Sequence, residues 1–368
     1  MVRDSLFGER IFWQGRCRST GVPSVPKVLA IVASVVSAVT ICYAVVAAES
    51  LEVPVGGMIL FAGWCATIAL GAWRIPLWWR SGLEYLVTER HVIWRRGRIR
   101  RSIETKQISY ALVRWDAADP ALGDLVLVRA VPTGALRRTL SLTLYGVESP
   151  DRLWATVRGV EPSAPLGNGE RPLAQRLDPG ERVLWSAGQH GSPWTSRRVG
   201  TAVVGAALAL TFVRSLARLV PNLVQVLKLH ALSPTLAALL VAGGALGMLL
   251  LLAGSAAGGY AAFVRPARLA RSTRYFVTNA RVLIRRGNEE LSLDRSNIAY
   301  VIDAPYKKLH DVFLVIDGPQ ARALAPSGAF GGEDRDDALR PVLAAIDDAD
   351  TVGRILRARE IELEKRAA

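Results

Sequence analysis

The sequence predicts a mixed membrane protein with four transmembrane α-helices in two hairpins and two copies of a small β-domain. Two observations concern composition: 51% of the 368 residues are hydrophobic and 21% are charged, and the apolar residues gather in four long segments. A third is a repeat, because YLVTERHVIWRRG at 85–97 returns as YFVTNARVLIRRG at 275–287. Such a composition is typical of membrane proteins, and the repeat indicates a duplicated domain.

The first pair of apolar segments covers residues 28–48 and 55–73. Each is long enough to cross a hydrocarbon core of about 30 Å. The connection between them contains Glu49 and Glu52 but no Lys or Arg, whereas basic residues flank the pair on both sides. The positive-inside rule therefore predicts that both ends of this hairpin are cytoplasmic. A removable signal peptide fits poorly, because the first segment is too long and the second follows at once.

The second pair of apolar segments is less regular. Residues 199–213 form a short run and residues 235–264 a long one, and the connection carries Arg214 and Arg218. We expect these two arginines to snorkel toward the outer interface. Pro221 predicts an interrupted helix, with the chain after it lying partly in that interface. Basic residues are again more numerous on the cytoplasmic side, so both termini of the chain are expected there.

Small residues mark one face of the fourth span. Gly243 and Gly247, and then Gly254 and Gly258, are each spaced four residues apart. A face of this kind allows close helix contact, and we expect packing against the other three spans. Homodimerisation through the same face is the alternative, which makes the chain a candidate homo-oligomer. The four spans contain no Asp, Glu or Lys, which weighs against an ion-coupled transporter.

The β-domain is predicted from alternating apolar residues. YLVT and HVIWRRG are strand-like, are separated by two residues, and end on a Gly suited to a tight turn. The strand pattern continues through RSIETKQISYALVRW, DLVLVRA and TLSLTLYG. A helix follows, with Ser149 as its N-cap and Pro150 at its first position. Several antiparallel strands and one helix suggest a bent sheet or partly open barrel that the helix closes.

The whole repeated unit consists of a lead, a hairpin and a β-domain, because GERIFW at 8–13 also returns as GERVLW at 180–185. In the second copy we expect the closing helix over 334–348. The predicted order is an N-terminal lead (1–27), a hairpin (28–73), a β-domain (83–160), a linker (161–180), a second lead (181–198), a second hairpin (199–264), a second β-domain (272–349) and a C-terminal helix (350–368).

These motifs resemble a known family. The Tyr-x-Val-Thr stretch, the following Val-Ile strand and the Arg-Gly turn are similar to bacterial pleckstrin-homology (PH) domains of the membrane-anchored type, which sit beside pairs of transmembrane helices. The resemblance implies two PH-like domains in a multi-pass protein of the bacterial inner membrane. The second copy departs from the pattern at Ala280, where a basic residue would fall, although Arg281 is adjacent; the first copy has Arg90 followed by His91 at this point.

Residues that could carry chemistry are few. None of the four His is spaced with another His or Cys as metal ligands usually are, and the three Cys lack a CxxC spacing. Asp347, Asp348 and Asp350 are interpreted as a solvated helix end. The sequence therefore predicts a protein that is not an enzyme and has no cofactor, no metal site and no catalytic residue.

The strongest candidate for a binding site is electrostatic. The net charge is +14, and a basic cluster surrounds the first turn of domain 1. Its members are Arg95, Arg96, Arg98, Arg100 and Arg101. The PH resemblance implies contact with anionic lipid headgroups at this turn. Two other roles for this basic cluster are membrane orientation alone and a protein-binding surface. The equivalent turn of the second β-domain carries Glu289 and Glu290.

The function predicted from these features is a non-enzymatic membrane scaffold that recruits or senses an unidentified protein partner at the inner leaflet. The first alternative is an anionic-lipid-binding module, and the second is a small transporter or channel subunit. Nucleic acid is disfavoured as a partner, because much of the Arg lies at span ends and no recognition helix is apparent.

Overall fold

The structure is a computed structural model of the chain. It describes residues 9–18, 21–51, 54–117, 119–131, 138–160, 177–191, 194, 196–228, 234–306, 309–316 and 339–356. The chain divides into two compact units, each described here by itself. The helical unit contains Gly21–Trp79 and Trp194–Pro266, and the β-unit contains Met1–Thr20, Arg80–Pro193 and Ala267–Ala368.

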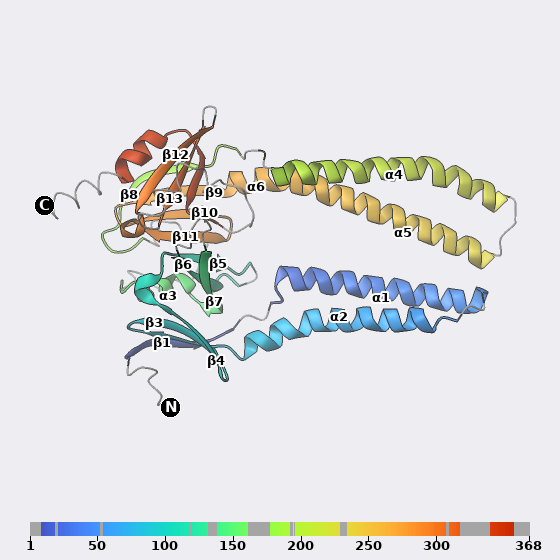
Figure 1. The fold of residues 1–368 in the computed structure, drawn as a ribbon, viewed down its shortest axis with the longest axis horizontal. Coiled ribbons are helices and arrows are strands. Elements are labelled where there is room, and N and C mark those ends of the chain that lie inside the picture. The colour runs from blue at the N-terminus through green and yellow to red at the C-terminus, as the bar shows by residue number, and fades with distance from the viewer. Residues whose placement is uncertain are drawn as a thin grey trace. The chain divides into compact units, whose positions relative to one another are not determined.

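The helical unit consists of two hairpins. The first joins α1 (Ser24–Leu51) to α2 (Gly56–Ser81), and the second joins α4 (Ser196–Lys228) to α5 (Pro234–Gly259) (Figure 1). Four helices among the described residues are long and apolar enough to cross a membrane. The candidate spans are Val25–Val45, Gly56–Ser81, Arg198–Asn222 and Val241–Ser272. The prediction of a membrane protein with four spans is thereby confirmed at this level.

The third span differs from its prediction. Pro221 lies inside a continuous α4 and does not interrupt it. A proline removes one backbone donor, but every other bond of the helix can still form, and an apolar environment strongly favours satisfied backbone groups. The fourth span, by contrast, has an irregular end. After α5 the chain makes one π-helical turn (Tyr260–Val264) and then α6 (Arg265–Ser272).

Module 1 is the part of the β-unit formed by residues 9–18 and 83–160. Its first sheet has the order β1-β2-β3-β4 and contains the lead strand. Its elements are β1 (Ile11–Arg16), β2 (Glu84–Thr88), β3 (His91–Arg96), β4 (Ile99–Glu104), a 3-10 turn (Thr105–Gln107), β5 (Tyr110–Trp115), β6 (Leu122–Val131), β7 (Arg138–Glu148) and α3 (Pro150–Val157). The strand and helix predictions for this domain are confirmed, and the structure adds the lead, because β1 pairs with β2.

Module 2 is the part of the β-unit formed by residues 177–191 and 273–356. Its elements are β8 (Val183–Gly188), β9 (Thr273–Thr278), β10 (Arg281–Arg286), β11 (Glu289–Asp294), a 3-10 turn (Arg295–Asn297), β12 (Tyr300–Tyr306), β13 (Leu309–Val315) and β14 (Val342–Ile346). A helix at 349–356 follows. In both modules the membrane hairpin is thus inserted between the first and second strands.

The helix predicted over 334–348 is wrong in its described part, since Val342–Ile346 is a strand. The run VLAAI is short and apolar, and such a run does not distinguish a buried strand from a buried helix. The helix at 349–356 takes the place of α3. Its Val352 and Leu356 are buried, so this part of the predicted C-terminal helix belongs to the core of module 2.

Several details repeat in the two modules. Gly97 and Gly287 close the equivalent hairpins with positive φ angles of 55° and 58°, as the turn prediction required. The Tyr85 hydroxyl donates to the carbonyl oxygen of Tyr145, and the Tyr275 hydroxyl donates in the same way to that of Ala344. Ser149 takes the N-cap position of α3, but with a φ of 49° and without a side-chain capping bond.

A single seven-stranded sheet joins the modules. Its order is β7-β6-β5-β11-β10-β9-β8, so the joint is the antiparallel pair of β5 from module 1 with β11 from module 2. The two faces of β5 and β6 serve different cores. Ala111, Val113, Leu125 and Leu127 face the core of module 1, whereas Tyr110, Leu112, Val126 and Val128 belong to the core of module 2. The two modules therefore form one body.

Candidate functional site

A glutamate in each lead strand region begins a polar cluster that recurs in both modules. In module 1, Glu9 lies beside the end of β2. The Thr88 hydroxyl is 2.5 Å from Glu9 Oε2, and His91 Nδ1 is 2.9 Å from Glu9 Oε1. The cluster connects the lead to the turn between β2 and β3, which explains why both GER and VT return in the repeat. Thr88 and the proximity of His91 lower the pKa of Glu9.

In module 2 the same positions form a buried ion pair. Glu181 takes the place of Glu9, Thr278 that of Thr88, and Arg281 that of His91. Arg281 donates from Nε to Glu181 Oε1 at 2.9 Å and from Nη2 to Glu181 Oε2 at 3.0 Å. The side chains are 7% and 1% exposed. Burial disfavours the charged carboxylate, but the two bonds and the charge of Arg281 outweigh it, so the pKa of Glu181 is lowered.

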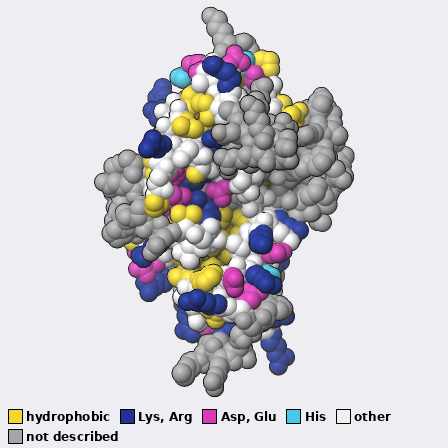
Figure 2. Space-filling model, turned by 90° about the vertical axis from the view of Figure 1, so that its left-hand side faces the viewer, with side chains coloured by type: hydrophobic (Ala, Val, Ile, Leu, Met, Phe, Trp, Pro, Cys, Tyr) yellow, Lys and Arg dark blue, Asp and Glu magenta, His cyan; other side chains and the backbone are white. Residues whose placement is uncertain are grey.

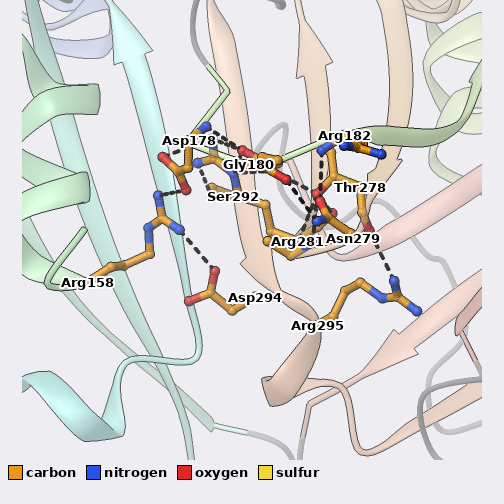
Figure 3. A network of polar contacts seen from close by, with 12 residues as sticks. Arg158, Asp178, Gly180, Arg182, Thr278, Asn279, Arg281, Ser292, Asp294 and Arg295 are labelled. Carbon is orange, nitrogen blue, oxygen red and sulfur yellow. Dashed lines mark hydrogen bonds and ion pairs between the residues drawn. The ribbon is translucent and has the colours of Figure 1, made fainter. Parts of the chain in front are cut away.

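This cluster extends across the joint between the modules (Figure 3). Arg158, at the C-cap of α3 in module 1, points toward two carboxylates of module 2. Its Nη2 lies 2.6 Å from Asp178 Oδ2, and its Nη1 lies 3.4 Å from Asp294 Oδ1. Asp178 Oδ1 is in turn 3.7 Å from Arg281 Nη2. Two arginines and three carboxylates thus form one network from α3 to β10.

A neutral hydrogen bond crosses the same joint. Trp154 on α3 donates from Nε1 to Ser292 Oγ at 3.1 Å, and both side chains are buried. Ser292 lies on β11, one strand away from Arg281, whose Nη1 is 3.3 Å from the same oxygen. Indole and guanidinium therefore meet at one hydroxyl. This contact ties the closing helix of module 1 to the sheet of module 2.

The carboxylates of the network are not equivalent. Burial raises the pKa of Asp294, and the charges of Arg158 and Arg281 offset that rise only in part. The pKa of Glu181 is lowered, as described above. The difference follows from geometry, because Glu181 receives two short bonds from one guanidinium whereas Asp294 receives one long bond.

Sequence reasoning missed this network. Arg158 lies in the predicted closing helix of the first β-domain, and Asp178 lies in the predicted linker. The repeated GER motif was the signal that could have indicated this network. Its glutamate, Glu9 or Glu181, returns together with the same strand pair, which indicates that it has a partner in the fold. The partner at 281 could not be recognised from the repeat, because the two copies carry different residues there.

The predicted basic cluster is divided by the structure. Arg95 donates from Nε to Glu84 at 2.8 Å and is half-buried, and Arg96 lies beside Gly82. Arg98, Arg100 and Arg101 are exposed. Ile99 stands among them with 51% of its surface exposed. On the face seen in Figure 2, basic and acidic side chains are interspersed and form no single basic field.

The exposed arginines belong to a free sheet edge. Within the described residues, β4 pairs with β3 alone, and its first four residues are all exposed. Its counterpart β11 pairs with β5, and Arg114 of β5 forms a 3.1 Å ion pair with Glu289 of β11. Equivalent strands of the repeat thus have opposite charges and opposite environments.

The glycine pairs of the fourth span also separate into two groups. A Cβ built on Gly258 would lie 2.8 Å from Gly205 Cα on α4, and one on Gly254 would lie 3.1 Å from Leu208 Cδ1. These two glycines allow α4 and α5 to approach closely. Side chains built on Gly243 and Gly247 would meet no atom within 4 Å. Gly254 and Gly258 therefore lie where α4 and α5 are in close contact.

A groove of about 610 Å³ lies between α1 and α2. Its lining is apolar apart from Ser34 and Ser37, and the Ser37 hydroxyl donates to the carbonyl oxygen of Ala62. The groove is therefore an apolar surface between two candidate spans.

In the described parts of the chain, no three His, Cys, Asp or Glu side chains are placed to hold a metal ion. Cys17, Cys42 and Cys65 are free thiols. His310 lies 2.9 Å from Asp303, and His190 lies 3.2 Å from Asp347.

Comparisons with protein-family models, with curated proteins and with solved structures found no match to this chain.

Proposed function

We propose that the chain is a non-enzymatic integral membrane scaffold whose two β-modules are PH-like and are held on the cytoplasmic face, where they recruit or sense a protein partner. The observation that carries this proposal is the joint. The modules share one sheet through β5 and β11, and β5 and β6 contribute to both cores. A scaffold requires docking surfaces at a fixed distance, and a shared sheet prevents independent rotation of the modules.

The polar network supports the same function. Buried ion pairs contribute little net stability, but they disfavour every arrangement in which a charge loses its partner. Arg158 reaches Asp178 and Asp294 only when α3 lies against β11. Such contacts select one relative orientation of the modules, which is what a recruitment platform needs.

In-membrane photo-cross-linking of the full-length chain tests this function. A photoreactive residue would be placed at exposed Arg152 of the β-unit and, as a matched control, at Leu60 of α2, which is 77% exposed. A scaffold gives a discrete adduct with a different protein from position 152, identified by mass spectrometry, and none from position 60. The proposal fails if an array of exposed β-unit positions, including 152, yields no protein adduct.

Anionic-lipid binding is a second candidate, favoured by one observation. Ile99 is exposed between Arg98 and Arg100 at the tip of a hairpin. An apolar residue flanked by basic ones is suited to a membrane interface, where each basic residue contributes roughly 1 kcal/mol near anionic lipid. Such binding would add an electrostatic contact to the anchoring by the four spans.

A fluorescent probe at the hairpin tests the lipid alternative. An environment-sensitive dye on Ile99→Cys, in nanodiscs of neutral or anionic lipid, should shift to the blue only with anionic lipid, and high salt should reverse the shift. Asn288→Cys at the equivalent turn of module 2 is the matched control. Equal spectra in both lipids would exclude this function, as would a shift that survives replacement of Arg98, Arg100 and Arg101 by Gln.

A further inference from the structure

The joint between the modules pairs one edge strand of module 1 with one edge strand of module 2. Because the module is duplicated, each of these two strands has a counterpart in the other module. In the joint, β5 of module 1 pairs with β11 of module 2. The counterpart of β11 in module 1 is β4, and the counterpart of β5 in module 2 is β12. Among the described residues β4 pairs only with β3, and β12 only with β13.

We infer that β12 of one copy of this chain pairs antiparallel with β4 of a second copy, in the register of the internal joint, so that the protein assembles head to tail through its β-unit. This assembly is independent of the proposed recruitment of other proteins, since it requires no partner but the chain itself. It is also distinct from any contact made by the glycines of the fourth span.

The register of the new pair follows from the hairpins. Ile99 and Glu289 are equivalent positions, because they pair with Arg96 and Arg286 across the equivalent hairpins. Tyr110 and Tyr300 are equivalent as well, because they pair with Val128 and Val315. The joint places Glu289 opposite Arg114, Glu290 opposite Val113, Leu291 opposite Leu112 and Ser292 opposite Ala111. The equivalent pairs between copies are Ile99 with Ala304, Arg100 with Asp303, Arg101 with Ile302 and Ser102 with Val301.

Charge complementarity selects this partner. Arg100 is exposed and has no acidic partner among the described residues, and Asp303 is exposed beside His310. The register places the two directly opposite each other, a position in which opposite charges stabilise a strand pair. Pairing of β4 with another β4 would bring arginines together instead. Charged edge strands discourage indiscriminate pairing.

The pair between copies is weaker than the internal one. The Trp115 N–H donates to the Asn288 carbonyl at the end of the joint, at 2.9 Å. Pro305 occupies the position equivalent to Trp115 and has no N–H, so this bond is missing. The contact between copies therefore has one hydrogen bond fewer than the internal joint.

The placement of the two edges determines the type of assembly. Within the β-unit, β4 and β12 lie at opposite ends (Figure 1). One copy thus offers a different edge at each end, and the contact is heterologous. Such contacts build rings if the rotation between copies closes and open chains if it does not.

Disulfide cross-linking in membranes tests the register. Two differently tagged full-length chains, with Cys17, Cys42 and Cys65 replaced by Ala, would carry Ser102→Cys and Val301→Cys respectively. Opposite residues of a strand pair are close enough for a disulfide. Mild oxidation should join the two differently tagged chains and leave two Ser102→Cys chains unlinked. Ala111→Cys with Ser292→Cys in one chain controls for the oxidation.

A charge exchange tests the recognition. Arg100→Glu in the first chain, or Asp303→Arg in the second, should lower the cross-linking yield by about tenfold, and the two together should restore it. Arg98→Glu, one residue outside the paired segment, is the matched control and should leave the yield unchanged. Hydrogen exchange at the internal joint verifies that each variant is folded.

Three outcomes would overturn the inference. The first is absence of the cross-link between copies while the internal control forms. The second is a link between two Ser102→Cys chains as strong as the mixed one. The third is a yield that Arg100→Glu and Asp303→Arg leave unchanged, or that their combination fails to restore.

Discussion

The hairpins β3–β4 and β10–β11 have the same local structure and opposite environments. Both end a strand on two arginines and turn on a glycine with nearly the same positive φ. The first four residues of β4 are exposed, whereas the next four after Glu289 on β11 are buried or half-buried. The local sequence determines the hairpin, but the presence or absence of a neighbouring strand determines whether the second strand has buried or exposed side chains. One copy became a joint, and the other kept a charged edge.

The lead clusters show the same divergence. His91 is 27% exposed beside Glu9, whereas Arg281 is 7% exposed beside Glu181. A guanidinium keeps its charge when it is buried, so module 2 depends on Glu181 for charge balance. The module that forms the joint therefore carries the stronger polar constraint.

The largest expected effect comes from exchanging residues between the two edges. Leu291 is fully buried on β11, and Arg101 occupies the equivalent exposed position on β4. Leu291→Arg should destabilise module 2 by at least about 4 kcal/mol, because it buries an unpaired charge. Arg101→Leu should change stability by less than about 0.5 kcal/mol. Hydrogen exchange of β9–β11 measures both, and equal losses would show that the edges are equivalent after all.

Removal of the lead glutamates should have the next largest effect. Glu181→Ala leaves Arg281 buried without its main partner and should cost about 3–5 kcal/mol, whereas Glu9→Ala should cost about 1 kcal/mol. Because the folded pKa of Glu181 is lowered, its contribution is present at neutral pH and is lost as the pH falls through that pKa. Denaturant titrations at pH 7 and in acid measure the difference, which should shrink in acid.

Residues that the two modules share should give equal effects. The hydroxyls of Tyr85 and Tyr275 each accept a hydrogen bond from a backbone N–H and donate one to a backbone carbonyl. The two distances are 2.9 and 3.0 Å for Tyr85. They are 3.1 and 3.2 Å for Tyr275. Replacement of either by Phe leaves both backbone groups without this partner and should cost about 1–3 kcal/mol. Parallel unfolding measurements should agree between the variants. A clearly unequal pair would mean that the joint also reinforces this shared contact.

The smallest effect is expected at Asp294, with the opposite dependence on pH. Its folded pKa is raised by burial, so its charged form lowers stability as the pH rises above the unfolded pKa. Asp294→Asn removes that penalty along with the long bond to Arg158, and should change stability at pH 7 by no more than about 1 kcal/mol. The stability of the variant minus that of the natural chain should therefore be larger at pH 7 than in acid. A variant that gains in acid instead would contradict this sign.

Most of the local structure could be predicted from the residues alone. The four apolar runs, the strand alternation and the Gly97 and Gly287 turns follow from hydropathy and backbone sterics, which act over a few residues. Two local predictions were wrong for the same reason. Pro221 and the run at 342–346 occupy positions where the surroundings, an apolar phase and a buried sheet, outweigh intrinsic preference.

The sequence by itself determined that this chain has four candidate spans in two hairpins and two copies of one β-module. Only the tertiary structure decided that the modules are one body, that β5 and β6 face two cores, and that Arg158, Asp178 and Arg281 meet. The physical reason is distance along the chain. Apolar periodicity is a property of each strand by itself. The partner of the β5 edge and the partner of Glu181 lie a hundred or more residues away along the chain, and periodicity contains no record of them.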